Sequence, residues 1–74
     1  MIIDLIITST DDGFNADVPS INGFDCWSAD EDELIQKSLE LVSFYLTLSE
    51  EQTITVDRVR REGKKTTYKL IFEK

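Results

Sequence analysis

Alternating apolar and polar residues open and close this chain, and a helical pattern lies between them. Residues 2–10 are mostly apolar and β-branched, and residues 14–18 alternate between apolar and polar types, which favours two strands. Asp12-Gly13 between them predicts a tight hairpin, since both positions of a two-residue type I′ loop need positive φ. The first eighteen residues therefore predict an antiparallel pair.

The loop length of this hairpin decides which side chains share a face. A two-residue loop places Ile7 opposite Val18 and gives one apolar face, whereas a three-residue loop would turn Ile2 and Ile6 inward and bury less. We expect the first arrangement. The predicted buried face carries Ile3, Leu5, Ile7, Phe14, Ala16 and Val18.

A bend and a short strand follow. Pro19 has no amide hydrogen for a strand ladder, so we expect it to end the second strand. Asn22-Gly23 predicts a turn, and residues 24–28 are long enough for a short third strand.

A long amphipathic helix is expected over residues 30–48. Residues 28–31 and 30–33 both match capping boxes, and their acids suit the positive end of a helix dipole. Leu39 and Phe44 widen the apolar arc to about 220°, more than one sheet needs, so we expect contact with another copy of the chain. The apolar stripe comprises Leu34, Ile35, Ser38, Leu41, Val42 and Tyr45.

The last third predicts a second hairpin, formed by residues 53–60 and 66–73. A three-residue loop at 61–63 with Gly63 left-handed pairs Val56 with Tyr68 and keeps the apolar residues together. That face holds Ile54, Val56, Tyr68, Leu70 and Phe72. The order is βββαββ, an α+β two-layer sandwich with one long helix on a mostly antiparallel sheet. We expect a single domain over residues 1–74.

Composition excludes several kinds of chemistry. The 74 residues contain no histidine and one cysteine, Cys26, which rules out His-dependent nucleophiles, an intramolecular disulfide and a cysteine zinc site. We expect no cofactor, no metal and no catalytic residue. The N-terminus has no basic segment before its short apolar run, and no stretch is long enough to span a membrane, so a cytoplasmic protein is expected.

The net charge of −7 conceals two oppositely charged parts. Residues 1–51 hold twelve acids and one base, a balance of −11, whereas residues 52–74 have a balance of +4. An acidic body repels nucleic-acid phosphates and attracts basic proteins, although acidic surfaces also simply keep small domains soluble.

Together these features resemble the HicB antitoxin family. The resemblance covers residues 1–48, about two-thirds of the chain. It rests on Asp12-Gly13 with Phe14, on Ala16, on Val18-Pro19, on Gly23 after the bend and on the acidic helix start at 30–33. The N-terminal domain of that family has a βββαβ, partial ribonuclease-H-like fold.

The resemblance implies a function. HicB proteins bind and occlude HicA, a small basic mRNA-cleaving toxin, which suits an acidic partner. Many continue into a DNA-binding domain, but this chain ends in a basic hairpin, so we expect no direct DNA binding. The alternative is a stand-alone ancillary domain that only self-associates, as a dimer or tetramer, or regulates another protein.

The acidic residues and the single tryptophan are the candidate partner-binding residues. Turn formation and helix capping explain Asp11, Asp12 and Asp30 equally well. Trp27 is either an interface anchor or part of the core beneath the helix. The candidates are Asp11, Asp12, Asp17, Asp25, Trp27 and Asp30, and those for an oligomer interface are Leu39, Phe44 and Tyr68.

Two rival functions are weaker. A ribonuclease-H-type nuclease would gather carboxylates such as Asp4, Asp17 and Glu40 around two Mg²⁺ ions, but we expect these three to point apart. RNA binding through the basic hairpin tip would have only Tyr68 nearby for stacking. Edge protection by charge, or docking of the basic tip on the acidic body of another copy, explains those cations better.

Overall fold

The computed structural model describes residues 1–48 and 53–73, and these contain five strands and one helix. In chain order the elements are β1 (Ile2–Ser9), β2 (Phe14–Asp17), β3 (Cys26–Ser28), α1 (Glu31–Tyr45), β4 (Thr55–Glu62) and β5 (Lys65–Ile71). The predicted order βββαββ is confirmed.

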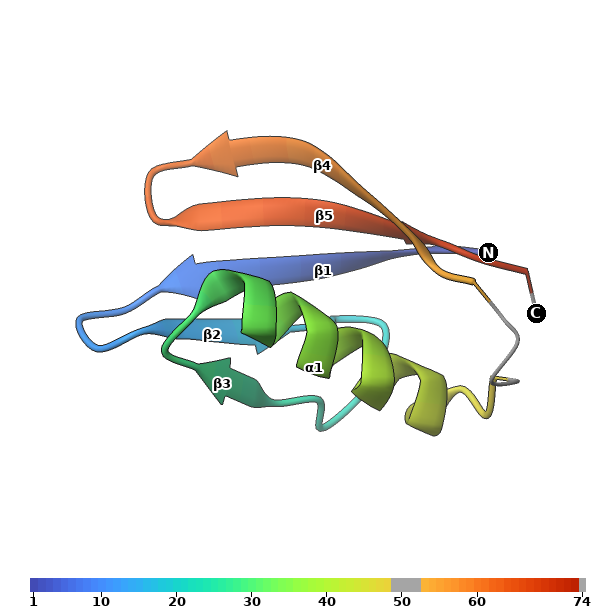
Figure 1. Ribbon diagram of the computed structural model, residues 1–74. Coiled ribbons are helices and arrows are strands. Elements are labelled where there is room, and N and C mark those ends of the chain that lie inside the picture. The colour runs from blue at the N-terminus through green and yellow to red at the C-terminus, as the bar shows by residue number, and fades with distance from the viewer. Residues whose placement is uncertain (49–52, 74) are drawn as a thin grey trace.

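The strands form one sheet in the order β3-β2-β1-β5-β4, and each neighbouring pair is antiparallel. Helix α1 lies on one face of this sheet, closest to β2 and β3 (Figure 1). The predicted α+β architecture, with one helix packed on an antiparallel sheet, is therefore confirmed.

The loop of the first hairpin differs from the prediction. The amide of Thr10 donates to the carbonyl oxygen of Gly13 at 2.8 Å, so the two loop residues are Asp11 and Asp12. Neither has positive φ, which excludes the predicted type I′ turn. The Asp12-Gly13 pair marked the hairpin correctly but misplaced its loop by one residue.

The register of this hairpin is also shifted from the expected one, by two residues. Ile7 pairs with Ala16, not with Val18. Because side chains alternate with a period of two, a shift of two residues leaves every side chain on its predicted face. Five of the six predicted residues are buried and Phe14 is half-buried.

Gly13 is needed for space. A Cβ atom there would lie 2.6 Å from the carbonyl oxygen of Ser28 and 2.7 Å from Cζ2 of Trp27. The hairpin strand and β3 therefore approach each other more closely than any side chain at this position allows.

Replacing Gly13 with alanine should lower the free energy of unfolding by about 1–3 kcal/mol, because backbone and indole must both move. It should also shift the emission of Trp27, the only tryptophan. The control Gly63→Ala has open space around it: its left-handed backbone will also lower the free energy of unfolding, but the emission should stay unchanged. Urea unfolding and fluorescence measure both effects; an unaltered spectrum in Gly13→Ala would contradict the close contact.

Helix α1 begins at the predicted cap. A side-chain oxygen of Asp30 accepts the amide of Glu33 at 3.2 Å, and Glu31, Asp32 and Glu33 fill the acidic first turn. These charges favour the N-terminal end of the helix dipole.

The helix ends at Tyr45, three residues before the expected Leu48. Thr47 takes a left-handed conformation with φ 55°, and its amide donates to the carbonyl oxygen of Phe44 at 3.3 Å. The amide of Leu48 reaches the carbonyl oxygen of Ser43 at 2.9 Å. This is a Schellman cap, a motif that usually has glycine at the left-handed position. Because position 47 is a threonine and not a glycine, the sequence contained no indication that the helix ends here.

A threonine in the left-handed region is strained, because its β-branched side chain crowds the backbone. Thr47→Gly should therefore raise the free energy of unfolding by about 1 kcal/mol. Thr47→Ala, which removes the branch but keeps Cβ, should give a smaller gain. Thermal unfolding of both variants measures this, and a destabilised glycine variant would argue against the left-handed cap.

The predicted helix stripe is only partly confirmed. Leu34, Ser38 and Val42 are buried against the sheet, and Ile35 and Leu41 are half-buried. At the helix end, Tyr45 is 48% exposed, and its ring is tilted against that of Phe24 with centroids 6.1 Å apart. Tyr45 therefore lies at the border of the core and not within it.

The second hairpin reaches its predicted face by another route. Glu62 pairs with Lys65, so the loop has two residues, Gly63 and Lys64, in place of the expected three. Gly63 is left-handed as predicted, with φ 57°.

A bulge in β4 compensates for the shorter loop. Val56 pairs with Leu70 and not with Tyr68, and the register shifts between Arg58 and Arg60, where Val59 is the extra residue. The bulge restores the alternation that a two-residue loop would have broken. Tyr68, Leu70 and Phe72 are buried, and Ile54 and Val56 are half-buried on the same face.

Candidate protein-binding surfaces

The sheet face that points away from α1, called here the open face, has no covering layer among residues 1–48 and 53–73 (Figure 1). Its side chains alternate with the buried residues of the same strands. Apolar and polar types mix on it: Ile2, Ile6, Asn15, Asp17, Trp27 and Ile71.

Trp27 lies on the open face of β3 and is 48% exposed. The prediction left open whether this residue belongs to the core or to a surface, and the fold places it on the surface. Its ring lies against Gly13. Asn15 lies opposite Trp27 on β2. With its side-chain nitrogen turned towards β3, Asn15 donates to the carbonyl oxygen of Cys26 at 3.1 Å and to Oδ1 of Asp25 at 3.3 Å.

Two of the predicted acids lie beside this tryptophan. Asp17 is exposed at the end of β2, where it pairs with Ile6. Asp25 precedes Cys26, whose partner Ala16 faces the core, so Asp25 is directed to the same side as Trp27. Asp17, Asp25 and Trp27 form one surface, which we call the tryptophan patch.

The remaining predicted acids, Asp11, Asp12 and Asp30, have local roles. Asp11 and Asp12 form the β1–β2 loop, and Oδ1 of Asp12 accepts the hydroxyl of Thr10 at 3.0 Å. Asp30 caps the helix. Asp12 adjoins Gly13, which lies close to Trp27 and Ala29, whereas Asp17 and Asp25 lie at the other end of β2.

The carboxylates considered for a nuclease do not converge. Asp4 and Asp17 lie on the open face, and Asp4 forms an ion pair with Lys69. Glu40 lies on the helix, in the other layer. Within the described ranges, no group of three or more Cys, Asp and Glu is placed to hold a metal ion.

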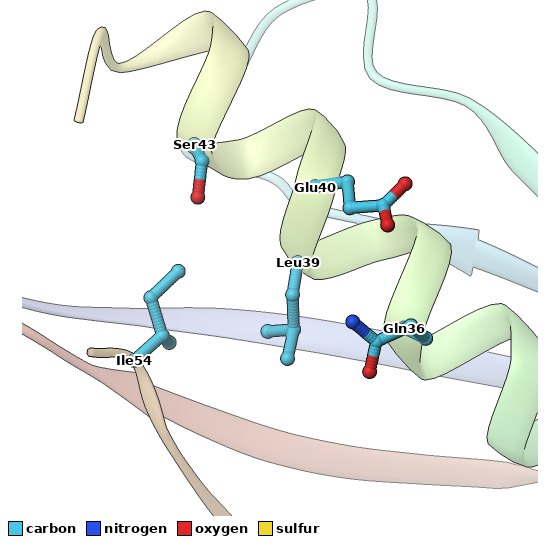
Figure 2. A pocket seen from close by; sticks show the side chains of 5 residues that line it. All are labelled: Gln36, Leu39, Glu40, Ser43 and Ile54. Atoms are coloured by element: carbon cyan, nitrogen blue, oxygen red, sulfur yellow. The ribbon is translucent and has the colours of Figure 1, made fainter. Parts of the chain in front are cut away.

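A groove on the other face separates α1 from β4. Figure 2 shows Leu39 between the helix and Ile54, with Gln36, Glu40 and Ser43 along the helix side.

The three residues predicted for an oligomer interface are placed differently from one another. Leu39 lines the groove and is half-buried, and Phe44 is 75% exposed on the last helical turn. Tyr68 is only 7% exposed, so its ring belongs to the core of its own chain. Tyr68 therefore offers an interface little surface of its own.

Charged residues of both signs surround Tyr68. Burial raises the pKa of its hydroxyl, and the nearby carboxylates of Glu31 and Asp32 raise it further, while Arg58 and Arg61 act in the opposite direction. Arg58 pairs directly with Tyr68 across the β4–β5 ladder.

The sequence did not predict that these two arginines face the helix. Strict alternation would place Arg58 and Arg60 together, but the bulge at Val59 sends Arg60 to the open face and turns Arg58 and Arg61 towards α1. The density of charge in this strand was visible, whereas its division between two faces depends on the bulge.

Comparison of the sequence with protein-family models, with curated proteins and with solved structures found no match. In the part of the chain that the structure describes, no helix is both long and apolar enough to cross a membrane.

The raised pKa of Tyr68 predicts a stability change at high pH. Tyrosine in the unfolded chain ionises near pH 10, so the folded state keeps its proton to higher pH. The contribution of the neutral Tyr68 hydroxyl to the free energy of unfolding is complete below about pH 10, and it is lost as the pH rises towards the pKa of the folded state. Tyr68→Phe should reduce this decline, and Tyr45→Phe should retain it. Urea unfolding between pH 9 and 11 measures it; an equal decline in Tyr68→Phe would contradict the assignment.

Proposed function

We propose that this chain is a protein-binding domain of the HicB antitoxin type, which occludes a small basic HicA-type mRNA-cleaving toxin. In this proposal it acts in the cytoplasm by shape and charge, with no cofactor and no catalysis of its own. The element order βββα of residues 1–48 supports the proposal, since the resemblance implies a βββαβ order for the N-terminal domain.

The observation that carries the proposal is the tryptophan patch. A half-exposed indole that already packs against Gly13 loses less side-chain freedom when a partner covers it than a fully exposed one would. Tryptophan is also among the residues that contribute most to binding energy at protein interfaces. The patch lies on a sheet face that leaves room for a second protein layer.

Charge supports a basic partner. Asp17 and Asp25 flank the indole, and residues 1–51 carry a balance of −11. The negative potential of the patch speeds the encounter with a positively charged protein and repels negatively charged competitors such as RNA. The patch therefore suits a partner whose own surface is basic enough to bind nucleic acid.

Co-expression tests the proposal directly. If the adjacent gene encodes a small basic protein, its product should inhibit growth when expressed alone, and the chain should restore growth and co-purify with it. If that product is neither toxic nor bound, the antitoxin proposal fails and the alternative, a self-associating ancillary domain, takes its place.

Two pairs of variants locate the binding surface. Trp27→Ala should weaken the complex by about 2 kcal/mol or more, whereas Phe44→Ala, an exposed aromatic on the helix, should not. Asp17→Lys should slow association, and Glu33→Lys, the same charge change in the helix layer, should slow it less. Surface plasmon resonance separates the two effects, and equal losses in test and control variants would place the site elsewhere.

A further inference from the structure

The helix leaves the β4 edge of its sheet face less covered than the rest. The backbone of α1 lies closest to β2 and β3 (Figure 1). The helix-side residues of β5 are still buried, whereas Ile54 and Val56 are only half-buried. The groove of Figure 2 runs along this edge, between the helix and the start of β4.

One wall of the groove is acidic. Asp32, Gln36, Leu39 and Ser43 follow helical spacing and share one flank of α1, and Glu40 lines the groove beside them. Glu31 precedes Asp32 in the same first turn, and both carboxylates are near enough to act on Tyr68.

The other wall is apolar at one end and basic at the other. Ile54, Val56 and Arg58 alternate onto the helix-facing side of β4, and the bulge adds Arg61 to that side. Both arginines are exposed and act on the same tyrosine as the two acids. The groove with these two walls is called the bipolar groove.

The charges of the bipolar groove are not neutralised by one another. Ion pairs among residues 1–48 and 53–73 join Lys37 to Glu33, Arg60 to Glu62 and Lys69 to Asp4. None of them uses Glu31, Asp32, Arg58 or Arg61. An acidic and a basic set therefore lie on either side of Tyr68, and half-buried apolar residues continue the groove from there.

We propose that a second copy of this chain docks on the bipolar groove, and that the two copies are related by a two-fold axis. In such an interface each contact occurs twice, so one surface must complement itself. A groove with one acidic and one basic wall meets this condition: Glu31 and Asp32 of each copy face Arg58 and Arg61 of the other.

Apolar surface next to the charged end of the groove supports the same occupant. Leu39, Ile54 and Val56 are only half-buried in the single chain, so a second copy would cover them. A basic toxin would be attracted to the acidic wall but repelled by the arginines, which makes it the poorer fit here. The dimer is independent of the tryptophan patch, which stays open on the opposite face of the sheet.

Size in solution gives the first test. Analytical ultracentrifugation of the full chain should give a particle of about 17 kDa, twice the 8.5 kDa of one chain, and 1 M NaCl should weaken it by screening. A particle of single-chain mass at a concentration of hundreds of micromolar would overturn the proposal.

Charge exchange gives the decisive test. The double variant Arg58→Glu/Arg61→Glu makes the charged end of the groove, around Tyr68, entirely acidic. The double variant Glu31→Lys/Asp32→Lys makes the same end entirely basic. Each double variant alone should dissociate at least about tenfold more readily. Mixed one to one, they should form a heterodimer, because both contacts then join opposite charges. Failure of the mixture to associate would reject the two-fold arrangement.

Matched controls exclude misfolding and unspecific charge effects. Lys64→Glu/Lys65→Glu makes the same charge change at the β4–β5 turn, outside the groove, and should leave the dimer intact. Circular dichroism should show an unchanged fold for every variant. Equal weakening by the turn variant would mean that net charge, and not the groove, controls association.

Discussion

Strand β1 pairs with β5 at seven positions, from Ile2 with Ile71 to Thr8 with Lys65, and this ladder joins the two ends of the chain. It inserts the first strand into the middle of the sheet and attaches the whole basic hairpin to the acidic body. Without this pairing β4 would have no fixed place relative to α1. Both the core and the bipolar groove therefore depend on this one long-range contact.

The second constraint is that only one face of the sheet is buried. Ile7 and Val56 both have different partners from those expected, yet each stays on its predicted side. A displacement by two residues costs nothing in burial, whereas a displacement by one would move a complete apolar set into water. In β4 the bulge at Val59 performs this correction. The same bulge interrupts a long edge strand, which discourages unwanted pairing with other sheets.

The two candidate surfaces lie on opposite faces of the sheet and differ in character. The tryptophan patch combines a rigid aromatic ring with acids of one sign, which suits a different, basic protein. The bipolar groove carries both signs, which suits a copy of itself. A dimer formed through the groove would leave two patches free, so a symmetric assembly could hold two partners at once.

Local signals in the sequence determined the elements, the faces and the helix start. Asp30 predicted the cap because a short side-chain acceptor before an acidic turn satisfies free amides locally, and the alternation around Leu5 and Leu70 predicted the buried faces. The sequence could not place the end of α1, since Thr47 takes a conformation that normally needs glycine. It could not give either register, because two-residue shifts preserve burial. The exposure of Trp27 and the turn of Arg58 towards the helix were decided by strand order and by one bulge, which arise only when distant segments pair.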